Sequence, residues 1–96
     1  MDALYVNASI TAKLSSGKEK KVTDSRQLFL ASEYRLRSIN TVYDYQETLQ
    51  EMLLEYCLTW PFEDIENFIY QMRQDVQWIN EKVEEGWELE FYHFLD

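Results

Sequence analysis

The chain has 96 residues and a formal net charge of −9 at pH 7, from 18 Asp and Glu against nine Lys and Arg. Apolar residues make up 46% of it and aromatic residues 16%, which predicts a single domain over residues 1–96 and excludes a disordered acidic chain. The longest stretch without a charged residue has ten residues, far short of a membrane-spanning helix.

The charge is unevenly divided along the chain. Residues 1–37 hold seven Lys or Arg and four Asp or Glu, a net charge of +3, whereas residues 38–96 hold two and fourteen, a net charge of −12. This balance disfavours direct binding of the main body to DNA, RNA or an anionic membrane and favours a basic partner.

The N-terminal third predicts a β-hairpin. Apolar and polar residues alternate strictly from Leu4 to Leu14, which is typical of a half-buried strand. A turn follows at 15–18, and a more polar strand returns over residues 19–23. Its basic residues are interpreted as protection of a sheet edge, with a nucleic-acid patch as the less favoured alternative; they are Lys18, Lys20 and Lys21.

A short helix is predicted after the hairpin. Asp24 and Gln27 have the spacing of a capping box, which marks the start of a helix. The apolar face of this helix would consist of Leu28, Phe29, Ala31, Leu36 and Ile39.

Two long amphipathic helices follow, over residues 41–60 and 61–86. Thr41 and Asp44 form a second capping-box pattern, Pro61 separates the two helices, and Gly86 is placed to end the second one. Apolar residues recur at helical spacing in both: Val42, Tyr45, Leu49, Met52, Leu53, Tyr56, Cys57 and Trp60 in the first, and Ile65, Phe68, Ile69, Met72, Val76, Ile79 and Val83 in the second.

Alternation resumes from Trp87 to His93 and predicts a closing strand. We expect this strand to pair beside the first strand of the hairpin. The predicted fold is therefore α+β in the order ββαααβ, with a small antiparallel sheet made of the N-terminal hairpin and the C-terminal strand, and with about three helices on one face.

The residues that suit a binding site are acidic. Asp44, Glu47, Glu51 and Glu55 lie off the apolar face of helix 41–60, and three of them are spaced four residues apart. This spacing stacks like charges about 6 Å apart and costs a few tenths of a kcal/mol per pair. No Lys or Arg occurs from residue 38 to residue 72. The row therefore predicts a partner-binding surface, and the alternative is an ordinary solvated face.

A second acidic group lies where helix 61–86 ends. Three of its carboxylates occupy the negative end of the helix dipole, where cations would be more favourable. Its members, also predicted to bind a partner, are Glu81, Glu84, Glu85, Glu88 and Glu90. Three aromatic residues lie off the apolar faces and are candidate interface anchors: Tyr43, Tyr70 and Trp78.

Little in the sequence could carry chemistry. His93 and Cys57 are the sole histidine and the sole cysteine, and Gly17 and Gly86 fit turns rather than a phosphate-binding loop. The carboxylates of the helices are expected to be solvated, whereas general acid–base catalysis needs a desolvated one. We therefore predict no enzyme activity, no cofactor and no metal site.

Rows of carboxylates on a rigid scaffold imitate the phosphates of a nucleic acid and suit a groove lined by Arg and Lys. In size, in charge, in the hairpin beginning Leu4-Tyr5-Val6-Asn7-Ala8-Ser9-Ile10 and in the acidic row, the chain resembles the small anti-CRISPR proteins of phages and mobile elements that act as DNA mimics. Within that group it is similar to inhibitors of the type I-F Cascade (Csy) complex. The resemblance covers the whole chain in size and charge.

The N-terminus has no basic start followed by an apolar stretch, and the single cysteine excludes an internal disulfide, so the sequence predicts a soluble cytosolic protein. The resemblance implies that the cell is an infected or host bacterial cell. It also implies competition with target DNA for the lysine-rich PAM-recognition region of the surveillance complex. The basic N-terminal third departs from a uniformly acidic mimic and implies that only one face imitates DNA. Two other classes fit the same charge: an immunity protein or antitoxin that neutralises a basic nuclease, and a structural module whose acidity serves solubility alone.

Overall fold

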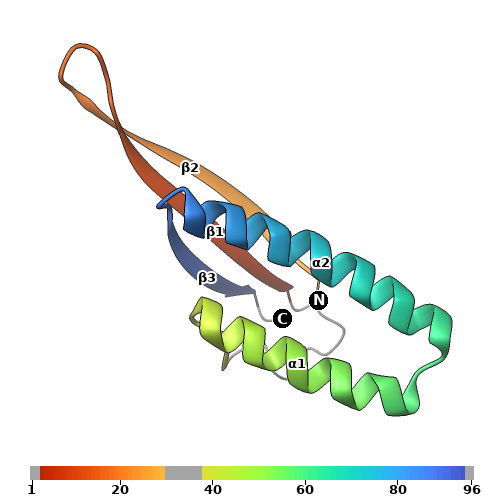
Figure 1. The fold of residues 1–96 in the computed structure, drawn as a ribbon. Coiled ribbons are helices and arrows are strands. Elements are labelled where there is room, and N and C mark those ends of the chain that lie inside the picture. Colours follow the sequence, from red (N-terminus) through yellow and green to blue (C-terminus); the bar gives the residue numbers. More distant parts are fainter. Residues whose placement is uncertain (1–2, 30–37, 95–96) are drawn as a thin grey trace.

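The computed structural model describes residues 3–29 and 38–94, and in them a three-stranded antiparallel sheet lies beside two helices (Figure 1). The elements, in chain order, are β1 (Ala3–Lys13), β2 (Glu19–Leu28), α1 (Val42–Thr59), α2 (Phe62–Glu84) and β3 (Glu88–Phe94). The strand order is β2-β1-β3. The predicted α+β class, the hairpin and the position of the closing strand beside β1 are confirmed, but the described residues contain two helices rather than about three.

The short helix predicted from Asp24 is wrong over residues 24–28, which belong to β2. This strand pairs with β1 from Glu19 opposite Lys13 as far as Leu28 opposite Leu4. Each added pair contributes ladder hydrogen bonds and cross-strand side-chain contacts, which outweigh the local capping pattern. Of the apolar residues predicted for this helix, Leu28 and Ile39 are buried and Phe29 is half-buried. Ala31 and Leu36 lie outside the described residues.

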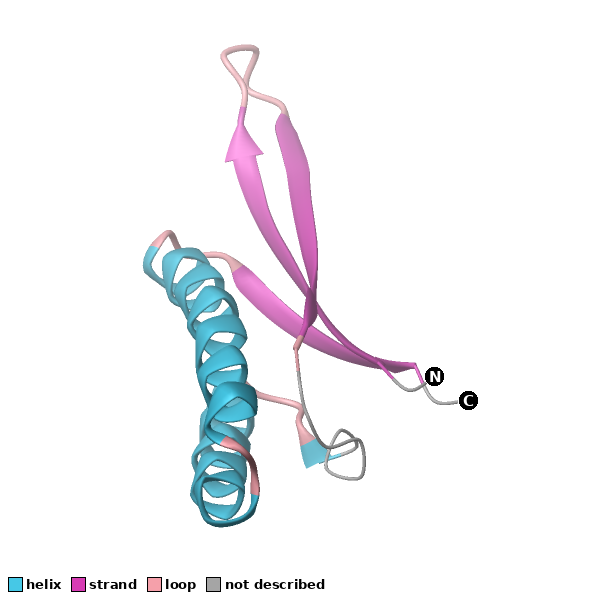
Figure 2. Cartoon of the chain, turned by 90° about the vertical axis from the view of Figure 1, so that its right-hand side faces the viewer, coloured by secondary structure: helices cyan, strands magenta, loops and turns pink. Residues whose placement is uncertain are grey.

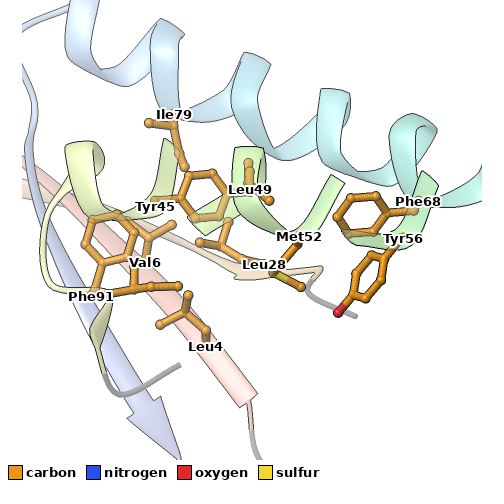
Figure 3. Packing of buried hydrophobic residues seen from close by; sticks show 11 residues of the cluster. Leu4, Val6, Leu28, Tyr45, Leu49, Met52, Tyr56, Phe68, Ile79 and Phe91 are labelled. Carbon is orange, nitrogen blue, oxygen red and sulfur yellow. The ribbon is translucent and has the colours of Figure 1, made fainter. Parts of the chain in front are cut away.

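The helices form one layer against one face of the sheet (Figure 2). Leu4, Val6 and Ala8 of β1 point into this layer and are buried, while the intervening Tyr5 and Asn7 are only half-buried. Figure 3 shows side chains from the strands and from both helices converging in a single core. Its buried members are Leu4, Val6, Leu28, Ile39, Tyr45, Leu49, Met52, Tyr56, Phe68, Ile79 and Phe91.

The ends of the helices follow the local sequence signals. At the start of α1, the Asp44 backbone N–H donates to Thr41 Oγ1, and the Thr41 backbone N–H donates to the Asp44 carboxylate, both at 3.1 Å. At the end of α2, Gly86 has a φ of 85°, and its N–H donates to the Val83 carbonyl oxygen at 3.1 Å. Glycine adopts this left-handed conformation without steric cost, which ends the helix where predicted.

The core-facing side of α1 is narrower than predicted. Tyr45, Leu49, Met52 and Tyr56 are buried, but Cys57 is exposed. Each helical residue is rotated by about 100° from the one before it, so Cys57 turns away from the side that Tyr56 occupies. The prediction that Cys57 widens the apolar face is therefore wrong.

The hairpin is longer than the rest of the sheet. β3 pairs with β1 only over Ala3–Ser9, so residues 10–22 continue as a two-stranded extension with a turn, here called the arm. Figures 1 and 2 show the arm projecting beyond both helices, and the molecule measures 57 × 26 × 20 Å. Every residue of the arm is exposed or half-buried.

Neither helix in the described part of the chain combines the length and the apolar character needed to cross a membrane.

Replacing Phe68 by Ala tests the core. Phe68 is fully buried and lies against Phe29, Tyr56 and Trp60, so Phe68→Ala should lower the free energy of unfolding by about 3–5 kcal/mol. The control is Leu54→Ala, an exposed position of α1, which should change stability by less than about 0.5 kcal/mol. Urea unfolding followed by circular dichroism measures both, and equal losses would contradict this packing.

Candidate protein-binding surface

The acidic row of α1 divides into two parts in the structure. Glu47, Glu51 and Glu55 are exposed, on the side of α1 away from the core. Glu51 already has an interaction within the molecule. Asp44 is half-buried, and its carboxylate accepts hydrogen bonds from the backbone N–H groups of Asn40 and Thr41. The role of Asp44 is therefore to cap the helix, and the exposed carboxylates are the three glutamates.

Exposed apolar side chains lie among these glutamates. Tyr43, Leu54 and Leu58 are 72%, 73% and 88% exposed. At about 100° per residue, all three project within roughly 40° of Glu47 around the helix axis. We call this surface the outer face of α1; its members are Tyr43, Glu47, Glu51, Leu54, Glu55 and Leu58.

The composition of the outer face differs from that of a solvated helix surface. Leu54 and Leu58 are four residues apart and both largely exposed, so they contribute little apolar burial to folding. Apolar and aromatic side chains rimmed by charge are typical of protein–protein interfaces. The two leucines were not predicted as part of this surface, although their i, i+4 spacing outside the core-facing side of the helix was a detectable signal.

The second acidic group does not form one surface. Glu81, Glu84 and Glu85 lie at the C-terminal end of α2 and are exposed. Glu88 and Glu90 alternate in β3 with the half-buried Leu89 and the buried Phe91, so they lie on the face of the sheet that the helices leave uncovered. The fold therefore separates the five carboxylates into two sets.

Several of these carboxylates accept hydrogen bonds from neighbouring side chains. The Gln77 amide donates to Glu81 at 3.2 Å, and the Tyr92 hydroxyl donates to Glu90 at 3.1 Å. The Trp87 indole N–H donates to Glu85 at 3.0 Å. These contacts give the group a part in local structure, which weakens the argument that it is kept for a partner.

A basic side chain, that of Lys82, also lies at this end of α2. The Lys82 ammonium nitrogen is 3.2 Å from the Asp24 carboxylate and 4.0 Å from the centre of the Trp87 ring. It is 5.4 Å from the Trp78 ring, and Trp78 is half-buried. Lys82 suits the negative end of the helix dipole. Of the three predicted aromatic anchors, Tyr43 and Tyr70 are largely exposed, whereas Trp78 is not.

One carboxylate of α2 is buried, contrary to the expectation that all helix carboxylates are solvated. Asp75 is 2% exposed and accepts a hydrogen bond from Arg26 Nε at 2.8 Å and another from the Phe29 backbone N–H at 2.6 Å. A buried carboxylate needs such partners. The pair joins the end of β2 to the middle of α2, with the Asp75 carboxylate buried and the Arg26 side chain 35% exposed, so the carboxylate has a structural role.

Tyr45 lies in the same region of the core. Its hydroxyl oxygen is buried and finds no hydrogen-bond partner among the residues that the structure describes. Burial raises the pKa of Tyr45 well above its ordinary value, and the negative charge of Asp75 raises it further, while Arg26 acts in the opposite direction.

The other side chains that could take part in chemistry either make contacts within the fold or are not grouped into a site. His93 Nε2 lies 2.8 Å from the Ile39 carbonyl oxygen, so the ring donates to the backbone there. Within residues 3–29 and 38–94, no group of three His, Cys, Asp or Glu side chains is arranged to hold a metal ion. The outer face of α1 is therefore the strongest candidate site.

Comparisons of the chain with protein-family models, with curated proteins and with solved structures found no match.

Replacing Tyr45 by Phe tests the buried hydroxyl. Because the pKa of Tyr45 is raised in the folded state, the unfolded chain loses this proton first, above a pH of about 10. The free energy of unfolding should then fall by up to about 1.4 kcal/mol per pH unit. Tyr45→Phe should remove this part of the loss of stability at alkaline pH. At neutral pH it should leave the free energy of unfolding unchanged or raise it by about 1 kcal/mol.

The measurement is urea unfolding of both proteins at neutral pH and above a pH of about 10. Tyr43→Phe is the matched control, because Tyr43 is largely exposed. Parallel stability curves for the wild type and Tyr45→Phe over this pH range would contradict the raised pKa.

Proposed function

We propose that the protein is an inhibitor that acts as an acidic DNA mimic and occupies the basic nucleic-acid-binding surface of another protein. The observation that supports it is the outer face of α1, where exposed glutamates share one side of the helix with the exposed Leu54 and Leu58. The proposal assigns the protein no catalytic activity, no cofactor and no direct contact with nucleic acid or membrane.

The two kinds of side chain on this face have different roles in the proposal. Glu47 and Glu55 take the place of phosphates, attract a groove rich in Lys and Arg, and release its counterions as DNA would. The net charge of −9 speeds association with such a groove. Leu54 and Leu58 add apolar burial against the protein wall, which the phosphates of DNA cannot supply.

The target proposed from the sequence resemblance is a type I-F CRISPR surveillance complex, at its PAM-recognition region, which makes the protein an anti-CRISPR inhibitor. The alternative is an immunity protein or antitoxin that neutralises a basic nuclease. The exposed leucines favour any globular protein partner with an apolar patch inside a basic surface, so both targets enter the test. With either target, the outer face of α1 is the surface proposed to bind it.

A DNA-competition experiment tests the proposal. At physiological salt the protein alone should not shift a DNA duplex, because its net charge is −9. In excess, it should reduce binding of target DNA by the purified type I-F complex in an electrophoretic mobility assay. A basic nuclease toxin is tested in parallel. Undiminished DNA binding by both proteins would rule out the mimic.

Reversing two charges tests the surface. Glu47→Lys with Glu55→Lys should weaken binding to the target by more than about tenfold, because two attractive contacts become repulsive. The thermal melting temperature should not fall, because the exchange removes like-charge neighbours from α1. Glu51 is left unchanged, because it already has a partner within the molecule.

The matched control is Glu66→Lys with Glu84→Lys, which makes the same charge change at exposed positions of α2. Affinity is measured by biolayer interferometry at low and moderate salt. If the α1 and α2 double variants weaken binding equally, the effect is due to net charge alone. If only the α2 variant weakens binding, the binding surface lies on α2 rather than on α1.

A further inference from the structure

The arm carries charge opposite to that of the rest of the chain. Residues 10–22 contain Lys13, Lys18, Lys20 and Lys21 against Glu19, a net charge of +3, so the other residues carry −12 of the total of −9. All five side chains are exposed. The arm is therefore a basic site on an otherwise acidic molecule.

The arm also carries apolar side chains that its own fold does not cover. Ile10 is half-buried and lies opposite Val22 in the register, and it continues the alternation of Leu4, Val6 and Ala8, so both residues belong to the sheet face that the helices pack on. The helix layer does not extend over the arm, and Val22 is exposed. Leu14 follows in the same alternation and is 45% exposed.

The arm and the outer face of α1 do not meet within one molecule. The tip of the hairpin points away from α1 in Figure 1 and rises beyond both helices in Figure 2. Each copy of the chain thus presents a basic surface with exposed apolar residues at one place and an acidic surface with exposed apolar residues at another.

We infer that the arm binds the outer face of α1 of a second copy of this chain. Lys18 and Lys20 are complementary to Glu47 and Glu55, and the exposed apolar residues of the arm are complementary to the leucines of α1. Because every copy has one arm and one outer face, two copies can satisfy each other reciprocally about a twofold axis. The partner's surface then covers apolar side chains that are exposed in one copy.

A nucleic acid suits the arm less well. Lysines of the arm could contact phosphates, but its apolar side chains would gain little from a sugar–phosphate backbone. The remaining −12 of the chain would also be repelled by a polyanion. A second copy uses both the charge and the apolar surface, so it is the occupant that these features favour.

The inference concerns the protein alone and does not depend on the target proposed above. The second copy and the target would bind the same face of α1, so they would exclude each other. A monomeric protein would refute the dimer and leave the inhibitor proposal intact. A dimer that does not compete with DNA for the target would refute the inhibitor proposal and leave the dimer intact.

Charge exchange tests the inference in sedimentation velocity over a concentration series. One variant carries Lys18→Glu and Lys20→Glu, and the other carries Glu47→Lys and Glu55→Lys. The wild type should dimerise, and each variant alone should dimerise at least about tenfold more weakly, because like charges face each other. An equimolar mixture should regain dimerisation, because the reversed arm then meets the reversed face while the two unaltered surfaces also pair.

Net charge alone predicts a different pattern. The α1 variant has a net charge of −5, since each exchange adds two units to −9, so general repulsion between its copies falls and it would associate more strongly than the wild type. Stronger association of this variant, or a mixture that stays monomeric, would overturn the inference.

Neutral substitutions test the apolar part. Leu14→Ser and Leu58→Ser each replace an exposed leucine, so both should fold, and each should weaken the dimer several-fold. Tyr70→Ser, at an exposed position of α2 outside both surfaces, should not. A wild type that is monomeric at every concentration, or a dimer that both leucine variants leave unchanged, would overturn the inference. So would a monomer whose arm lysines shift a short DNA duplex.

Discussion

The ion pair between Arg26 and Asp75 fixes how the sheet and the helices sit on each other. Arg26 lies opposite Val6 in the sheet, and Asp75 is buried near the middle of α2. Removing Arg26 would leave the buried Asp75 carboxylate without its charged partner, which is strongly destabilising. The second hydrogen bond, from the Phe29 N–H, fixes the chain just beyond β2 as well. With α2 held in this way, α1 packs its tyrosines and methionine inward, which leaves Glu47 and Leu58 facing out.

Local sequence signals accounted for most of the elements. Alternation predicted β1 and β3, the Thr41–Asp44 spacing predicted the start of α1, and Gly86 marked the end of α2. The length of β2 was missed, because its second half is set by pairing with β1 and not by its own residues. The burial of Asp75 was missed for the same reason, since its partner Arg26 lies 49 positions away along the chain.

The candidate surface was predictable only in part. Exposure of the glutamates on α1 followed from the helical period, because the core-facing residues fix the opposite side. The separation of Glu88 and Glu90 from the carboxylates of α2 was missed, because the five residues were grouped by their closeness in the sequence. Alternation with Leu89 and Phe91 places these two on the sheet face that the helices leave uncovered. Leu58 lies off the predicted apolar face of the helix and was given no role, because only charged and aromatic side chains were considered as contacts there, whereas the structure leaves it 88% exposed.

Positive and negative charge are separated in this molecule. A fold selected for stability alone would intersperse opposite charges, yet the arm holds +3 and the rest of the chain −12. Screening lengths in physiological salt are about 8 Å, and the molecule is 57 Å long. The basic arm projects beyond the helices and away from α1 (Figure 1), so the arm and the acidic face of α1 act as separate electrostatic sites. Neither site neutralises the other within the molecule, so the charge of each remains available to a partner of opposite charge.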